Sequence, residues 1–373
     1  MDRARTPLND AERIDWLRLI RTRNVGPRLF VDLVERFGTA AAALDALPDL
    51  ARRGGGRRKF NIPARDSAVS ELEALAKAGG MVLGLWEPDY PETLAAIADP
   101  PPLLFLHGDA AFLTRPTVAI VGARNASANG RRLAEEIASE LGEAGYVVVS
   151  GLARGIDAAA HAGALNTGTI AAIAGGIDIV YPPEHEDLQH RIAEAGVLVS
   201  EQPVGTRPTA RHFPARNRLI SGLSRGVLVV EAALKSGSLI TSRLALEQGR
   251  EVFAVPGSPR DPRCKGTNDL IRQGAVLTEN AADIVSALSQ QMLKPRPVTT
   301  RPIPRQPVET PPETAPETAR AEILELLGAA PTGVDELVRE CHMSAASVRS
   351  TLLELELAGR IERHPGNRVS LVL

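Results

Sequence analysis

Runs of residues that are apolar at every position predict a parallel sheet in the middle of the chain. Segments such as VAIV, VVVS and VLVV lack the alternation of a strand with one wet face. Strands of this kind are buried on both faces, as in parallel sheets. Amphipathic segments fit between them as helices, so the pattern predicts a doubly wound α/β domain. The expected strands are 117–123, 146–151, 169–175, 196–201, 226–232 and 251–257.

The two ends of the chain have helical patterns instead. Residues 10–50 contain three short helical segments, and the NVGP turn between the first two resembles a helix-hairpin-helix connection. Near the C-terminus, three helical segments and a hairpin turning at 365–367 have the pattern of a winged helix. Eight prolines in 290–318 indicate a semi-extended linker, and RRGGGRRKF at 52–60 indicates a loop.

These patterns divide the chain into four parts. We expect a helical domain at 1–85, with a SAM-like or helix-hairpin-helix-like fold, and an extended Rossmann-like domain at 86–289. The proline-rich linker at 290–318 then leads to a winged helix at 319–373.

Composition limits the function classes. The formal net charge is −2, so only locally clustered charge would bind phosphates. Two cysteines cannot build a disulfide framework or a cysteine-rich zinc site. No stretch approaches ~20 apolar residues, and residues 1–16 have no apolar signal region. We therefore expect a cytoplasmic protein without a membrane segment.

Glycine-rich turns follow the expected strands. Ligands bind outside the carboxyl ends of strands in such sheets. After the first strand, Gly122 permits close backbone approach, while Arg124 and Ser127 add a charge and a donor beside a helix N-terminus. The interpretations are an anion site or an ordinary tight turn. The loop is not GxGxxG, and no acid ends the second strand to hold a ribose, which disfavours a dinucleotide site.

The second strand leads into SGLARGID at 150–157. Gly151 and Gly155 allow a compact turn, and Arg154 supplies charge. Asp157 and His161 stand at i and i+4, for which a hydrogen bond on the helix surface is favoured over a metal pair. In the next loop, Tyr181 stacks on a base or is a half-buried aromatic residue.

The richest segment is EQPVGTRPTARHFPARNR at 201–218. No Asp or Glu lies between Gln202 and Val230. Arginine matches phosphate oxygens and stacks on bases, so this window predicts phosphate-backbone binding. We expect Leu219, Ile220 and Leu223 to anchor a helix while Arg216, Asn217 and Arg218 lie exposed at its start. The basic residues of the window are Arg207, Arg211, His212, Arg216, Arg218 and Arg225.

A further strand-to-helix junction carries Lys235, Ser236 and Gly237, where capping or anion binding explains the small residues. The chain has no nucleophile elbow, no HExxH, no Walker loop and no paired carboxylates on these loops. The pattern therefore predicts a binding surface, with no catalytic residue, no metal and no cofactor.

Together these segments resemble the DNA-processing protein A (DprA/Smf) family between about residues 100 and 285. The motifs are VGARNASANG, SGLARGIDAAAH, GGIDIVYPPEH, FPARNRLISGLS, VVEAALKSGSLIT, EVFAVPG and GTNDLIRQGA. The resemblance implies a Rossmann-like core at 86–289 that binds single-stranded DNA, a homodimer, and loading of the RecA recombinase during natural transformation. Carried over by motif, the DNA contacts would be Arg124, Ser127, Arg216, Asn217 and Arg218, with Lys235 as a candidate. Together with the loops described above, the predicted DNA-binding residues are Gly122, Arg124, Ser127, Gly151, Gly155, Arg211, Arg216, Asn217, Arg218, Lys235, Ser236 and Gly237.

One departure and two alternatives remain. The family often has a basic residue near Ala210, and here Arg211 stands next to it. A nucleotide-binding enzyme of the phosphoribohydrolase type would use the same loops, with Glu231 as its acid. Alternatively, the winged helix binds the DNA, although Arg349 and Arg360 are offset by nearby glutamates.

Overall fold

The chain folds into two compact units, and each unit joins segments that are distant in the sequence. The computed structural model describes residues 6–55, 61–293, 317–341, 343–364 and 366–372. One unit combines residues 1–8 with 69–296, and the other combines 9–68 with 297–373. Most of the expected linker, the end of the loop at 52–60 and Pro365 of the expected hairpin lie outside the described residues.

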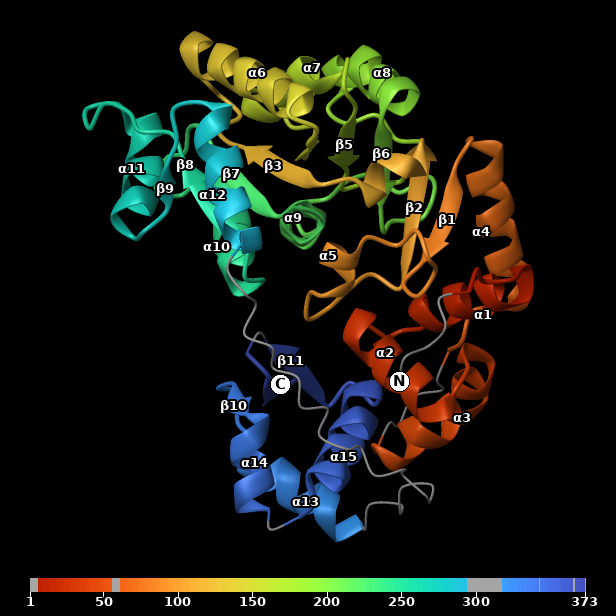
Figure 1. Cartoon of the computed structure of the whole chain (residues 1–373). Helices are drawn as coiled ribbons and strands as arrows, with labels where there is room; N and C mark the ends of the chain where they lie inside the picture. The colour runs from red at the N-terminus through yellow and green to blue at the C-terminus, as the bar shows by residue number, and fades with distance from the viewer. Residues whose placement is uncertain (1–5, 56–60, 294–316, 342, 365, 373) are drawn as a thin grey trace. The chain divides into compact units, whose positions relative to one another are not determined.

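The first unit is built on a nine-stranded sheet of order β1-β2-β6-β5-β4-β3-β7-β8-β9 (Figure 1). The seven strands from β6 to β9 in this order are parallel, whereas β1 and β2 pair antiparallel. The strand order reverses at β3, which pairs with both β4 and β7. The strands are β1 (Met81–Gly84), β2 (Leu103–Gly108), β3 (Thr117–Val121), β4 (Val147–Ser150), β5 (Thr169–Ala172), β6 (Val197–Ser200), β7 (Gly226–Val229), β8 (Glu251–Ala254) and β9 (Val276–Leu277).

Helices cover both faces of this sheet. In Figure 1, α6, α7 and α8 lie along one side, and α9 and α10 lie along the other. One buried cluster packs α6, α7 and α12 onto β3, β4 and β7. Within the described ranges, no helix combines the length and the apolar character needed to cross a membrane. The helices of this unit are α5 (Glu92–Ala95), α6 (Ala128–Glu143), α7 (Ile156–Ala164), α8 (Glu186–Ala195), α9 (His212–Leu223), α10 (Ser238–Glu247), α11 (Lys265–Arg272) and α12 (Ala281–Leu293), and α4 (Arg65–Lys77) lies at its border with the other unit.

The doubly wound sheet predicted from the sequence is confirmed. Strands β3, β4, β5, β6 and β7 are buried at every position, which is why their sequences show no alternation. The prediction missed β1, β2 and β9. Strands β1 and β9 lie at the edges of the sheet, and β9 has only two residues, so these two carry little pattern. Strand β2 is an interior strand with a buried apolar run, and that run was interpreted only as the lead into the second domain.

The second unit contains the N-terminal helices and the expected winged helix. Helix α3 was expected to end at Leu50 but continues past Pro48 to Arg53. The elements are α1 (Asp10–Ile20), α2 (Pro27–Phe37), α3 (Ala40–Arg53), α13 (Glu317–Leu326), β10 (Thr332–Gly333), α14 (Val334–Glu340), α15 (Ala345–Leu357), β11 (Ile361–His364) and β12 (Arg368–Leu371). The three helices and the strand order β10-β12-β11 confirm the winged helix.

Two glycines let α6 and the α7 region approach closely. A Cβ at Gly163 of α7 would overlap the carbonyl group of Glu135 in α6, and a Cβ at Gly142 would overlap the Thr167 side chain. The backbone itself cannot move aside without shifting a helix. Glycine is therefore required at position 163 by packing rather than by backbone conformation.

This packing predicts that Gly163→Ala changes the free energy of unfolding in the direction opposite to that expected from helix propensity. On propensity alone, replacing a helix-interior glycine by alanine stabilises by roughly 0.5–1 kcal/mol. We expect Gly163→Ala to lower the free energy of unfolding by about 1–3 kcal/mol instead, because the added methyl overpacks the contact. Urea unfolding measures the change. Gly237→Ala is the control, since no atom lies within 4 Å of its Cβ position, and a stabilised Gly163→Ala protein would contradict the packing.

Candidate nucleic-acid interface

A cavity of about 410 Å³ opens at the carboxyl ends of β3, β4 and β5. The loops that follow these strands form much of its wall, and the start of α9 forms the rest. Three arginines and two aromatic rings face it. The lining residues are Arg124, Asn125, Gly151, Leu152, Ala153, Arg154, Ile173, Ala174, Gly175, Ile179, Tyr181, Pro182, Pro183, Pro208, Phe213 and Arg216.

Arg216 lies buried in the wall of this cavity. Its side chain comes from α9, and the residue is only 6% exposed. Nη1 donates to the backbone oxygen of Ala172 at the end of β5, over 2.6 Å. A Cβ at Gly151 would overlap the Arg216 guanidinium, so glycine leaves the space that the guanidinium fills. Nε has no hydrogen-bond partner within the described residues.

A buried carboxylate compensates the charge of Arg216. Asp157, at the start of α7, accepts a hydrogen bond from the Gly151 amide over 3.2 Å. Burial lowers the pKa of Arg216 to about 10, and Asp157 acts against that fall. Burial also raises the pKa of Asp157, and Arg216 opposes that rise. Arg216 therefore stays charged at neutral pH although it lies in the interior.

His161 holds the strained loop beside Arg216. Leu152 has φ of 54°, a conformation that costs a residue with a side chain about 1 kcal/mol or more. Its amide donates to Nε2 of His161 over 3.3 Å. Nδ1 must then carry the proton, which it donates to the Thr169 hydroxyl over 2.8 Å. The expected hydrogen bond on the helix surface is wrong, because Asp157 and His161 are both buried and accept from the neighbouring Gly151 and Leu152 amides of the loop after β4.

The titration of His161 follows from its burial. Burial, and to a lesser extent the nearby charge of Arg216, lower the pKa of His161 to about 3. The imidazole is therefore neutral at all physiological pH values. Among the described residues, no group of three or more His, Cys, Asp or Glu side chains could hold a metal ion.

Aromatic rings and arginines meet at the cavity. Tyr181 and Phe213 lie with ring centroids 5.6 Å apart, and the Arg124 guanidinium lies 5.2 Å from the Phe213 centroid. Tyr181 is 44% exposed, so its face is open to a ligand. Arg154 pairs with Glu184, and both side chains are partly exposed. Phe213 was missed at the sequence level, although it stands inside the arginine-rich segment.

Arg218 and Asn217 do not line the cavity. Arg218 is only 12% exposed and pairs with Glu201 and, over 3.2 Å, with Asp99. Burial opposes its charge, but Glu201 and Asp99 raise its pKa overall. The expectation that Arg216 and Arg218 lie exposed at the helix start is therefore wrong, whereas Leu219, Ile220 and Leu223 are buried as expected.

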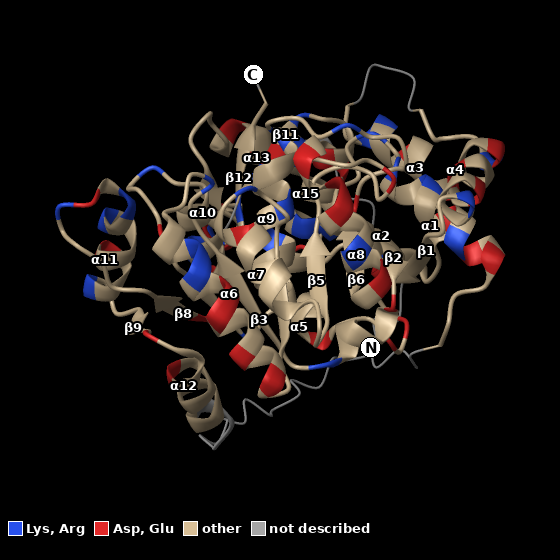
Figure 2. Cartoon of the chain, turned by 90° about the horizontal axis from the view of Figure 1, so that it is seen from above, with Lys and Arg blue, Asp and Glu red and all other residues tan. Residues whose placement is uncertain are grey.

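The window without acidic residues is not uniformly basic in space. Asp99, Asp157 and Glu201 approach its arginines from other segments of the chain. Figure 2 shows basic and acidic residues interspersed over the molecule. Arg154 is likewise paired, with Glu184. The positive potential available to a ligand therefore comes mainly from Arg124.

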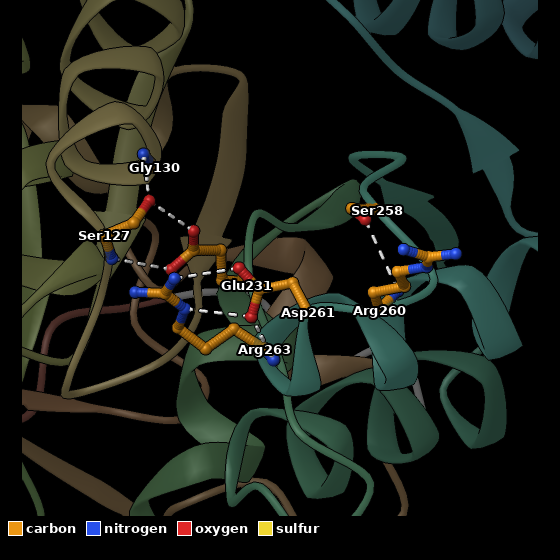
Figure 3. Close-up of polar contacts among 7 residues, drawn as sticks. All are labelled: Ser127, Gly130, Glu231, Ser258, Arg260, Asp261 and Arg263. Carbon is orange, nitrogen blue, oxygen red and sulfur yellow. Dashed lines mark hydrogen bonds and ion pairs between the residues drawn. The ribbon is translucent and has the colours of Figure 1, made fainter.

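The N-terminus of α6 binds a carboxylate of the protein itself (Figure 3). The Ser127 amide and hydroxyl donate to Glu231 over 2.9 and 2.6 Å, and the Gly130 amide donates to the Ser127 hydroxyl. Glu231 is 7% exposed. A Cβ at Gly130 would overlap its carboxylate. The donors that the sequence assigned to a phosphate are thus engaged inside the protein.

The same close-up contains the loop that precedes α11. Asp261 accepts from the Arg263 guanidinium over 2.8 Å, and Ser258 accepts from the Arg260 amide (Figure 3). Asp261 also caps the short helix Pro262–Cys264. The Arg263 oxygen also accepts from the Ala232 amide over 2.6 Å, which ties this loop to the end of β7, and the loop adds no residue to the cavity lining.

The remaining predicted residues lie around the cavity or apart from it. Gly122 packs against Ile156, and Gly155, with φ of 79°, packs against the backbone oxygens of the first loop. Arg211 is exposed outside the cavity lining. The loop before α10 contains Lys235, Ser236 and Gly237. The side-chain Nδ2 of Asn217 donates to the Gly237 oxygen of this loop over 3.5 Å. The cavity thus gathers Arg124, Gly151 and Arg216 of the predicted set.

Comparisons with known proteins cover nearly the whole chain. The family model described as DNA recombination-mediator protein A matches residues 81–289. A DprA-like N-terminal HHH domain matches 10–74, and a DprA winged helix domain matches 307–367. Protein Smf from Synechocystis sp. is 35% identical, over 96% of this chain and 98% of its own length.

Two solved structures are similar to the chain. The structure of DNA processing protein A from Streptococcus pneumoniae matches with a TM-score of 0.64 and 36% identity, covering 73% of this chain and 96% of that one. DNA processing protein A from Helicobacter pylori, whose structure is described as giving insight into a single-stranded DNA binding mode, matches with a TM-score of 0.52 and 32% identity. That match covers 57% of this chain and 96% of that one.

The buried imidazole predicts a pH dependence of stability. Because folding lowers the pKa of His161, its contribution is present above pH ~6.5, the unfolded value, and is lost as the pH falls toward 3. Between pH 6.5 and 5 we expect the wild-type free energy of unfolding to fall by about 2 kcal/mol more than that of His161→Gln. Urea unfolding at both pH values measures this. Asp157 titrates in both proteins, so parallel pH profiles would contradict the assignment to His161.

Proposed function

The chain belongs to the DNA recombination-mediator protein A family, and on that premise we propose that it is a non-enzymatic mediator that binds single-stranded DNA. We further propose that it acts in the cytoplasm as a homodimer and loads the RecA recombinase onto the strand during natural transformation. The observation that carries the DNA-binding proposal is the cavity in which Arg124, Phe213 and Tyr181 meet.

The chemistry of the cavity suits a single strand. A base stacks on an aromatic face with little regard to sequence, and this is worth about 1–3 kcal/mol per base. Tyr181 and Phe213 supply such faces. Arg124 and Arg154 supply guanidinium groups that match phosphate oxygens. A duplex keeps its bases stacked inside, so the aromatic rings favour an unpaired strand.

We assign the predicted residues different parts in this proposal. Arg124 contacts phosphate, and Gly151 and Gly155 shape the loop that carries Arg154. Arg216 forms the charged wall of the cavity. Outside the cavity, the path of the bound DNA strand continues along Arg211 and the loop Lys235–Gly237. Ser127 acts through Glu231, by holding α6 against the end of β7.

The enzymatic alternative gains no support from Glu231. Its carboxylate oxygens accept hydrogen bonds from Ser127, and it is not among the cavity-lining residues. A sugar bound in the cavity would therefore not meet it. We retain binding without bond cleavage as the proposed activity.

Two variants separate stacking from charge. We expect Phe213→Ala to weaken binding of a single strand roughly tenfold with an unchanged salt slope, because a stacking face is lost. Arg124→Ala removes a phosphate contact, so the log–log salt slope becomes shallower by about 0.7. Fluorescence anisotropy over a salt series measures both. Arg132→Ala, an exposed arginine of α6, should change neither value, and an Arg124→Ala protein that matches wild type would exclude the phosphate role.

The exposed edge of the sheet supports the proposed homodimer. Strand β9 ends the sheet, and Leu277 on it is 48% exposed. An open edge with an exposed apolar side chain favours pairing with another chain.

The dimer proposal is tested by mass. We expect Leu277→Arg to reduce the mass of the free protein from dimer to monomer in light scattering, because a charge at the contact is costly to bury. Met81→Arg is the matched control, since Met81 is also 48% exposed but lies on β1, the opposite edge. A Met81→Arg monomer with a Leu277→Arg dimer would move the interface to the other edge.

A further inference from the structure

Helix α15 of the winged helix is buried on two sides. One side packs into the winged-helix core through Val348, Leu352 and Leu355. A second stripe at helical spacing is also buried, with exposed fractions of 7% or less. It consists of Ser350, Leu353, Glu354 and Leu357. A helix that serves only its own core needs one buried stripe.

The N-terminal helices of the same unit cover this second stripe. Asn24 Nδ2 donates to the Leu357 oxygen over 3.0 Å, and Arg36 Nη1 donates to the Ser350 hydroxyl over 3.0 Å. A Cβ at Gly54 would overlap the carbonyl oxygen of Glu354. The contact is therefore close-packed at the backbone and specific in its hydrogen bonds.

The hairpin strands of the winged helix take part as well. Arg28 Nη2 donates to Asn367 Oδ1, at the start of β12, over 3.1 Å. Burial raises the pKa of Asp32 in α2, and Arg363 on β11 acts against that rise, so Arg363 lies near the N-terminal helices as well as pairing with Glu356 of α15. The two parts that a winged helix offers to DNA, the third helix and the wing, both contact protein here.

Charge distribution agrees with a contact between proteins. The winged helix at 319–373 has six basic and eight acidic residues, whereas residues 9–68 have twelve basic and eight acidic residues. Burial raises the pKa of the Glu354 carboxyl, and Arg53 and Arg36 from the N-terminal helices act against that rise. Arg320 of the winged helix also pairs with Glu354, over 3.8 Å.

We propose that the α15 face of the winged helix is a protein-docking surface whose partner is the N-terminal helical segment of the same chain, residues 24–55, and that the winged helix takes no part in DNA binding. A recognition helix that enters a groove needs an exposed, basic face. The α15 face has the opposite character: it is covered, half apolar and acidic.

Gly54 allows the contact to be broken from one side. Its φ and ψ of −66° and −3° suit any residue, so a larger side chain is compatible with the end of α3 itself. Among the described residues, the three atoms nearest to a Cβ at this position all belong to α15 and its C-cap residue, Ala358. We therefore expect Gly54→Leu in the full chain to undock the winged helix, and amide hydrogen exchange in α15 to accelerate by roughly tenfold or more.

DNA binding by the same variant distinguishes a face that only contacts protein from a DNA-binding face that the N-terminal helices cover. We expect the affinities of Gly54→Leu for single-stranded and for duplex DNA to stay within about twofold of wild type at equal salt. A gain of about tenfold for duplex DNA would overturn the proposal, because the face would then be a covered DNA reader. A loss of single-strand affinity, or unchanged exchange in α15, would overturn it as well.

Two further variants complete the test. Gly328→Leu is the matched control, because its Cβ position is open and lies away from the contact. It should leave exchange in α15 unchanged. Asn24→Gly combined with Arg36→Ala removes two of the docking hydrogen bonds without adding bulk, and glycine accommodates the φ of 66° at position 24. This double variant should accelerate exchange in the same direction even if Gly54→Leu does not fold.

Discussion

The candidate interface depends on one buried guanidinium. Arg216 reaches from α9 to the ends of β4 and β5, where it lies against Gly151 and bonds the Ala172 oxygen. A buried charge is stable only when it is paired, and Asp157 supplies the pairing. Removing either partner would strand the other inside the protein. The pairing of Arg216 with Asp157 therefore holds three parts of the site together. These parts are the ends of β4 and β5, the loop after β4, and helix α9, which carries Phe213.

Most of the fold was predictable because burial leaves a mark on sequence. The central strands are buried on both faces, so their sequences are continuous apolar runs, and such runs identify them as strands of a parallel sheet. The edge strands β1 and β9 have no such constraint: Met81 and Leu277 are about half exposed, and β9 is too short for a pattern. The contact between the two ends of the chain was not predictable either, since the sequence of α15 does not indicate that α3 packs against it.

The candidate site was predictable in its residue types and not in their surroundings. Glycine turns and arginines at strand ends indicated the correct edge of the sheet. Local charge, however, is a poor guide to potential, because acids from remote segments neutralise Arg216 and Arg218. The aromatic pair of Tyr181 and Phe213 was also hidden, since Tyr181 lies in the loop after β5 and Phe213 lies in α9, and only the folded chain brings them together.

The fit of Arg216 against Gly151 has an evolutionary consequence. A larger residue at 151 would displace the guanidinium, and a smaller residue at 216 would leave Asp157 uncompensated. Neither position can change alone without loss, so the two should vary together or not at all. Gly130 and Glu231 are bound by the same logic. In each pair, two residues that are far apart in the sequence are therefore constrained together during evolution.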